Sequence, residues 1–85
     1  MVKEYRNKAG DLHRLDGPAI IYPDGTKAWY INGQRHRKDG PAFIGSNGSK
    51  AWYINGKEYS YVDWYMLIHP TMSKVEKVKL VLKHG

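Results

Sequence analysis

The sequence predicts an α+β fold, an antiparallel β-meander of two and a half hairpin repeats covered on one face by two C-terminal helices. The first observation is internal repetition. Residues 13–35 recur as residues 36–58 without a gap, with 15 of 23 aligned positions identical, and a fixed period is the signature of a repeat array. The second is a change after residue 58 to helical spacing of apolar side chains. Together they divide one domain, residues 1–85, into a degenerate capping half-repeat (1–12), two repeats (13–35 and 36–58) and a helical cover (59–85).

Each repeat carries two strand signals and two turn signals. The strands are short apolar runs, at 19–22 and 27–31 in the first repeat. The turns are Asp-Gly or Asn-Gly pairs, at 24–25, 32–33, 47–48 and 55–56. Such pairs favour tight hairpins in which both central residues have positive φ, because Gly accepts that region freely and Asn or Asp accept it at low cost. We therefore expect a meander of about five or six short strands.

The first twelve residues look like a worn half-repeat that keeps the glycine turn. Aligning Gly10 with Gly33 sets Tyr5 opposite Ala28, and residues 2–6 are expected to form an edge strand. An atypical terminal unit with a polar outer side is what a short array needs as a cap.

Side-chain alternation along the strands separates the repeated aromatic residues. Trp29 and Trp52 fall on one face of the sheet, and Tyr30 and Tyr53 fall on the other. Tryptophan has the largest area to bury, so we expect the face with the tryptophans to be core, under the first C-terminal helix. Tyr30 and Tyr53, joined by Tyr22, are then left as an exposed platform.

The segment after residue 58 predicts two helices. Ser60 and Asp63 have the spacing of a capping box, and His69-Pro70 ends the first helix because the residue before proline disfavours the α region. Ser73 to Glu76 is a second cap, ahead of a helix over 74–83. The apolar face of this second helix consists of Val75, Val78, Val81 and Leu82. Apolar residues alternating with lysine would also suit a strand here; we favour the helix.

The run Trp-Tyr-Ile-Asn-Gly-Gln-Arg-His-Arg-Lys-Asp-Gly-Pro-Ala at 29–42 resembles MORN-type repeats, which are β-hairpins with an aromatic residue, Asn-Gly and a later His-Gly-x-Gly. Because Arg37 to Ala42 follow the histidine here, the match is closer to a variant seen in small proteins of bacteriophages and other large DNA viruses. The resemblance covers Asp11 to Glu58. It implies a non-catalytic scaffold for protein contacts and, for a phage-like protein of this size, an accessory factor that binds and modulates a host protein.

The amino-acid composition limits the classes of partner that the chain could bind. The 85 residues carry 14 Lys and Arg against 8 Asp and Glu, a formal charge of +6, and contain no cysteine. The charge favours an acidic protein or nucleic acid as partner. The lack of cysteine fits a reducing cytoplasmic setting, the host cytoplasm for a viral protein. Neither a signal peptide nor an apolar run of about 20 residues is present, so no membrane contact is expected.

The residues His13, Arg14 and Asp16 recur as His36, Arg37 and Asp39. One interpretation is that the histidines lie together and bind a metal or transfer protons. We favour structural roles, in which each aspartate accepts N–H bonds in its Asp-Gly-Pro turn and each histidine bonds a neighbouring carbonyl. A zinc site would need a further ligand that no cysteine supplies, so no metal and no cofactor are expected. Trp29 and Trp52 are likewise interpreted as structural positions.

The residues expected to bind a partner are the tyrosines and a basic rim: Tyr22, Tyr30, Tyr53, Lys27, Lys50, Arg35 and Arg37. Because Tyr and Arg are enriched at protein hot spots, binding of a host protein with an acidic surface is the first hypothesis. The same surface would suit nucleic acid or a small anionic nucleotide that the protein sequesters. A homodimer surface or simple sheet packing is the structural alternative. No phosphate loop or activated nucleophile is recognisable, so no enzyme activity is expected.

Overall fold

Eight strands and two helices make up the part of the chain that the computed structural model describes, residues 1–71 and 73–84. The strands are β1 (Lys3–Glu4), β2 (Ile20–Ile21), β3 (Lys27–Ala28), β4 (Tyr30–Ile31), β5 (Gln34–Arg35), β6 (Phe43–Ile44), β7 (Lys50–Ile54) and β8 (Lys57–Tyr59). The helices are α1 (Tyr61–Ile68) and α2 (Lys74–His84). The helix expected over 74–83 is thereby confirmed.

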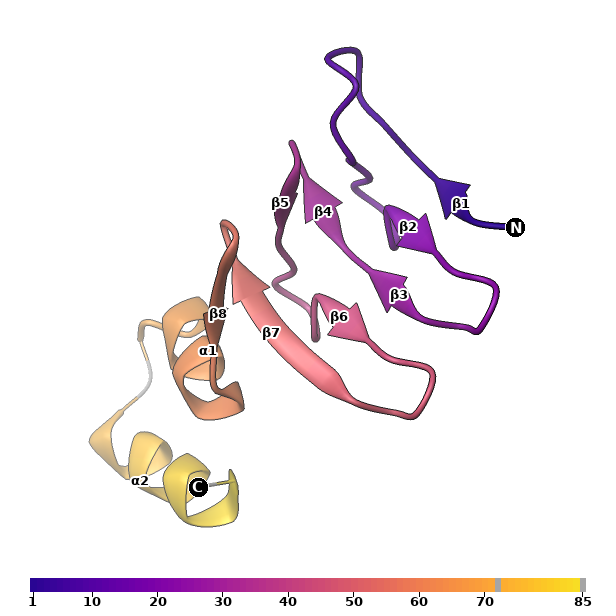
Figure 1. Cartoon of the computed structure of the whole chain (residues 1–85). Helices are drawn as coiled ribbons and strands as arrows, with labels where there is room; N and C mark the ends of the chain where they lie inside the picture. Colours follow the sequence, from indigo (N-terminus) through magenta and orange to yellow (C-terminus); the bar gives the residue numbers. More distant parts are fainter. Residues whose placement is uncertain (72, 85) are drawn as a thin grey trace.

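Six of the strands form one antiparallel sheet in the order β1-β2-β3-β6-β7-β8, and β4 pairs with β5 in a small hairpin. The α+β fold class is confirmed (Figure 1). The hairpin is the first repeat's counterpart of the β7–β8 pair, since Tyr30 lies opposite Arg35 as Tyr53 lies opposite Glu58. The second repeat keeps one unbroken strand, β7, where the first has β3 and β4. The molecule is elongated, with extents of 45 × 29 × 18 Å.

The hairpin turns are of two kinds. Asn32 and Asn55 have φ of 50° and 51°, and the glycine after each has 82°; both positive values were predicted for a two-residue turn. At 23–25 and 46–48 that prediction is wrong, because only Gly25 and Gly48 have positive φ. These are three-residue loops with glycine in the left-handed position. The carboxylate of Asp24 accepts the N–H of Thr26 (2.9 Å), a bond that lowers the pKa of Asp24.

The N-terminal half-repeat is offset by one residue from the predicted alignment. Tyr5 takes the place of Trp29, and not that of Ala28. Its backbone N–H donates to the carbonyl of Ala19 (2.8 Å), as the N–H of Trp29 donates to the carbonyl of Ala42 (2.7 Å). The offset arises because the first turn is one residue longer than the Asn-Gly turns that follow it.

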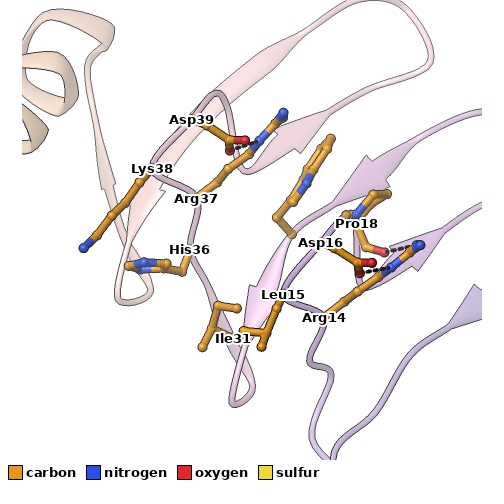
Figure 2. A pocket seen from close by; sticks show the side chains of 11 residues that line it. Arg14, Leu15, Asp16, Pro18, Ile31, His36, Arg37, Lys38 and Asp39 are labelled. Carbon is orange, nitrogen blue, oxygen red and sulfur yellow. Dashed lines mark hydrogen bonds and ion pairs between the residues drawn. The ribbon is translucent and has the colours of Figure 1, made fainter.

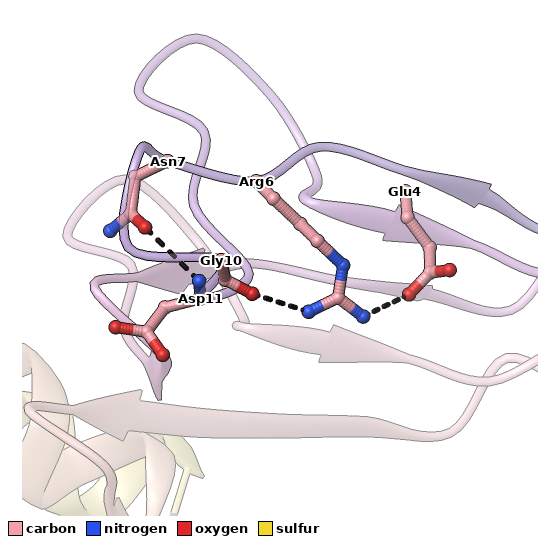
Figure 3. A network of polar contacts seen from close by, with 5 residues as sticks. All are labelled: Glu4, Arg6, Asn7, Gly10 and Asp11. Atoms are coloured by element: carbon pink, nitrogen blue, oxygen red, sulfur yellow. Dashed lines mark hydrogen bonds and ion pairs between the residues drawn. The ribbon is translucent and has the colours of Figure 1, made fainter.

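Polar side chains close this longer turn (Figure 3). The side-chain oxygen of Asn7 accepts the backbone N–H of Asp11 (3.0 Å). Arg6 donates to the carbonyl of Gly10 and to the carboxylate of Glu4, at 2.6 Å each. The edge strand β1 is therefore tied to its turn by surface contacts, with little apolar burial at this end of the sheet.

Helix α1 covers the last strand pair. Ser60 caps it by accepting the N–H of Asp63 at 3.1 Å, and the helix ends before His69-Pro70 as predicted. It packs against β7 and β8. Trp64 is its one buried residue, 5% exposed, and its Nε1–H donates to the carbonyl of Arg37 (2.9 Å).

Helix α2 packs against α1 (Figure 1). The predicted cap is present, since Ser73 accepts the N–H of Glu76 (3.2 Å). The apolar stripe that was expected to cover the sheet is exposed instead. Its members are Val75, Val78, Val81 and Leu82, with 46–81% of their surface open. The other buried apolar residues among those described are Ala19, Ile20, Ala28 and Ala42, so the sheet is held mainly by its backbone ladder and side-chain stacks.

Candidate functional site

Strand register divides the side chains of the sheet between two faces. Residues directly opposite on antiparallel strands point to the same side, so Lys27, Ile44 and Lys50 share a side. Alternation places Trp29 and Trp52 there too, and we call this side the tryptophan face. The opposite side, the tyrosine face, carries Ala28, Tyr30, Phe43, Ala51 and Tyr53.

Arg35 joins the two repeats on the tyrosine face. Its guanidinium donates to the hydroxyl oxygens of Tyr30 (3.0 Å) and Tyr53 (3.2 Å). Its Cζ also lies 5.2 Å from the ring centroid of Phe43. Tyr30 and Tyr53 are half-buried, so they do not form the open platform that was expected. Their rings and hydroxyls instead hold neighbouring hairpins together.

The other residues predicted to bind a partner do not gather around these tyrosines. Tyr22 is 41% exposed and lines a separate hollow with Phe43, beside the turn at 23–25. Lys27 and Lys50 lie on the tryptophan face, and Arg37 stacks there on Trp29. Of the predicted basic rim, Arg35 is the member on the tyrosine face. Strand alternation places Lys27 and Lys50 on the same side as the tryptophans, so the predicted rim was wrong for these residues.

Two links, residues 13–19 and 36–42, lead into β2 and β6. On the tryptophan face, the arginine of each link covers an aromatic ring, an arrangement we call the clasp. Figure 2 shows the arginine and the aspartate of both links. The Cζ of Arg37 lies 3.9 Å from the ring centroid of Trp29. Its Nε donates to Asp39 (2.8 Å) and its Nη1 to the carbonyl of Pro41 (3.0 Å). The aspartate therefore binds the guanidinium, where N–H bonds within the turn had been expected. The first clasp consists of Arg14, Tyr5, Asp16 and Pro18.

At the third aromatic position a helix replaces the clasp. Trp52 is covered by Tyr61 of α1, with the ring centroids 5.2 Å apart in an edge-on arrangement, and by Trp64, 6.3 Å away. The position 23 residues after Arg37 is Ser60, the helix cap. Trp52 is thus under the first helix, as predicted. Trp29 is not, because Arg37 occupies that space.

His13 and His36 each hold the following Asn-Gly hairpin turn. Nδ1 of His13 accepts the backbone N–H of Asn32, and Nδ1 of His36 accepts that of Asn55, both at 3.0 Å. The partner is an N–H and not the expected carbonyl, so this nitrogen carries no proton. Burial, with a smaller effect of the Lys38 charge, lowers the pKa of His36 and favours its neutral form. Within residues 1–71 and 73–84, no three His, Asp or Glu side chains are grouped as metal ligands.

Two open grooves follow one another along the tryptophan face. The first, about 440 Å³, lies between the links, with Trp29 and Ile31 in its lining. The second, about 780 Å³, is lined by Ile54 and by residues of α1. His36 and Lys38 line both grooves. Figure 2 shows Lys38 extending away from the first groove.

Leu15 stands at the rim of the first groove, close to Ile31 (Figure 2), and is 82% exposed. The sequence interpretation missed it. The available signal was a leucine between Arg14 and Asp16, where the second repeat has Lys38. Together with Ile31 it adds apolar area to the lining of this groove.

Comparison with known proteins gives no relative: no family model, no curated protein and no solved structure matches the chain. The resemblance of residues 11–58 to MORN-type repeats stays a prediction from the motif. Among the residues that the structure describes, no helix has both the length and the apolar character needed to cross a membrane.

Proposed function

We propose that the chain is a non-catalytic binding module that holds the acidic surface of a host protein against its tryptophan face. The single observation that carries the proposal is the pair of tandem grooves. Each has an isoleucine in its lining, Ile31 or Ile54, and Lys38 lies between the two. Apolar area bordered by charged groups is the usual composition of a protein-contact surface.

The groups that could carry chemistry are engaged in holding the repeats, which favours binding over reaction. Nδ1 of His13 and of His36 accepts a backbone N–H. Asp16 and Asp39 each accept from the arginine of their own clasp. A catalytic site needs a nucleophile within reach of a base that is free to move a proton. Along the grooves, the described histidines and aspartates are committed to structure.

Nucleic acid and an anionic nucleotide are the weaker candidates. Stacking of bases needs open aromatic rings, but Arg37 covers Trp29 and Tyr61 lies against Trp52. The net charge of +6 suits an acidic protein equally well.

The motif resemblance supplies the biological setting of the proposal. A MORN-like variant of the phage type fits a small accessory factor that acts in the host cytoplasm, where it would inhibit or redirect a host component during takeover or anti-defence. The partner sought is therefore a host protein.

A capture experiment with two matched leucine variants tests this function. Leu15→Ser removes the apolar rim of the first groove, and Leu82→Ser makes the same change on α2, where the side chain is equally open at 81%. We expect saturable capture of one host protein, weakened at least tenfold by Leu15→Ser and unchanged by Leu82→Ser. Equal behaviour of the two variants would contradict the proposal. So would capture that nuclease abolishes, or recovery of a second copy of the chain alone.

A further inference from the structure

A row of five side chains crosses the tryptophan face in continuous register. The members are Lys3, Ile21, Lys27, Ile44 and Lys50. Each neighbouring pair is directly opposite on adjacent strands, so all five point to the same side. They come from β1, β2, β3, β6 and β7, the first five strands in the order of the sheet. We call this set the lysine–isoleucine row.

The row is open and carries uncompensated positive charge. Its three lysines are exposed and its two isoleucines half-buried. The ion pairs among the described residues join Arg6 to Glu4 and each clasp arginine to its aspartate. None of them involves Lys3, Lys27 or Lys50. On the tyrosine face, the residues next to the row along β2 and β3 are buried, since Ile20 is 8% and Ala28 is 2% exposed.

The spacing of the row selects the shape of a ligand. Neighbouring strands are about 4.8 Å apart, so the lysines follow one another at about 9.6 Å with an isoleucine midway. An α-helix presents side chains on one stripe about every 5 Å, at i, i+3 or i+4, and i+7, and its i to i+7 separation is about 10.5 Å. A helix lying across the strands therefore meets every member of the row.

We propose that the lysine–isoleucine row binds an acidic amphipathic α-helix of the partner protein. Acidic side chains one heptad apart would meet Lys3, Lys27 and Lys50. Apolar side chains at the intervening turns would meet Ile21 and Ile44. The inference rests on the proposed function and deepens it, because it specifies what the partner presents to this end of the tryptophan face.

Other ligand shapes match the row less well. A β-strand places side chains of one face about 6.7 Å apart, which fits neither spacing. A polyproline II segment repeats at about 9.3 Å, so it could meet the lysines but would leave the isoleucines between them without a partner. A phosphate backbone has no apolar group to place on Ile21 and Ile44.

The test uses the full chain and a synthetic helical peptide of about 18 residues, long enough to span the roughly 19 Å row. The peptide carries Glu at i, i+7 and i+14 and Leu at the intervening turns of the same face. A control peptide of the same composition has the Glu residues on the opposite face. Binding is measured by fluorescence anisotropy. We expect saturable binding of the first peptide, at least tenfold tighter than that of the control.

Two matched charge variants locate the site. Lys27→Glu reverses the centre of the row, and Lys8→Glu makes the same change in net charge at an exposed lysine in the turn of the N-terminal hairpin, outside the row. We expect Lys27→Glu to weaken binding at least tenfold and Lys8→Glu less than twofold. A peptide whose central Glu is replaced by Lys should regain affinity for Lys27→Glu. Circular dichroism checks that both variants keep the fold, and Lys27→Gln provides a milder second variant at the same position.

The inference is overturned if both peptides bind equally, if both variants weaken binding equally, or if a single-stranded oligonucleotide displaces the peptide more strongly than unlabelled peptide does. These outcomes differ from failure of the proposed function. If capture of the host protein depends on Leu15 but peptide binding is unaffected by Lys27→Glu, the proposed binding function stands and helix binding at the lysine–isoleucine row is refuted.

Discussion

Gly40→Ala tests whether the clasp stabilises the repeat, because the added methyl group would enter the space of the guanidinium. A Cβ at this position would lie 2.8 Å from Cζ and 3.0 Å from Nη1 of Arg37. The backbone φ of Gly40 is outside the left-handed region, so alanine meets no backbone strain there. The end of an arginine side chain moves easily, and the cost is therefore the loss of what the guanidinium binds.

The magnitude follows from three contacts of Arg37. A charge-assisted hydrogen bond like that to the carbonyl of Pro41 is worth about 1.5–3 kcal/mol. Stacking on Trp29 adds about 0.5–1 kcal/mol. The ion pair with Asp39, which is 85% exposed, adds about 0–1 kcal/mol. Replacing glycine by alanine returns about 0.4–1 kcal/mol by restricting the unfolded chain. We expect a net loss of roughly 1–4.5 kcal/mol, a fall in Tm of at least about 4 °C for a domain of this size.

A double-mutant cycle with Arg37→Ala separates the clasp from other effects. Without the guanidinium, the Gly40→Ala methyl group meets no obstruction from Arg37, and only the effect on the unfolded chain remains. The substitution should then be neutral or stabilise by up to about 1 kcal/mol. Urea denaturation followed by circular dichroism measures all four proteins. The same cost in both backgrounds would refute the reasoning. Gly17→Ala, whose Cβ would lie 3.0 Å from Cζ of Arg14, should act in the same direction and more weakly.

Two further predictions concern the histidines and the helix. The pKa of His36 is lowered in the folded chain, so the unfolded chain binds a proton that the folded chain excludes. The free energy of unfolding is therefore highest above about pH 6.5 and falls as pH decreases through the folded-state pKa of His36. Urea midpoints between pH 8 and 5 should show this fall, and an equal fall in His36→Gln would contradict the reasoning. Trp64→Phe keeps a ring over Trp52 but removes the donor to the Arg37 carbonyl. We expect the free energy of unfolding to fall by about 1–2 kcal/mol, measured by urea denaturation. An unchanged midpoint would show that this hydrogen bond contributes nothing.

Local rules recovered the apolar strands of each repeat, the helix caps and the assignment of Trp29 and Tyr30 to opposite faces, because these depend on neighbours in sequence. They also predicted the Asn32-Gly33 turn. They did not predict β5 and β8, which are mostly polar. They missed the three-residue turn around Asp24, since the same Asp-Gly pair serves a two-residue loop or the end of a longer one. Pro23 favours an early position in a type I turn, but the equivalent loop at 46–48 has Ser46 there, so no single residue distinguishes the two loop types.

Strand alternation does not predict which face of the sheet is exposed to solvent, because the exposure depends on contacts between the links and the strands. Tyr30 and Tyr53 are connected by Arg35, which donates a hydrogen bond to each hydroxyl and lies 18 residues before Tyr53 in the sequence. Arg35 lies opposite Tyr30 in the same hairpin, but nothing local to Tyr53 marks it as bound. The exposed stripe of α2 is a similar case, since its spacing defines a face but not what that face meets.

The clasp also explains where the array stops. Three equivalent aromatic rings, at Tyr5, Trp29 and Trp52, each need a cover on the tryptophan face. The first two receive an arginine from the following link, and the third receives Tyr61 and Trp64 from α1. Because Ser60 stands where a third clasp arginine would be, the same residue that withholds the arginine also caps the helix that replaces it. The arginine position of the repeat is thus taken by the cap of α1, and α1 serves as the end cap of the array by covering its last aromatic ring.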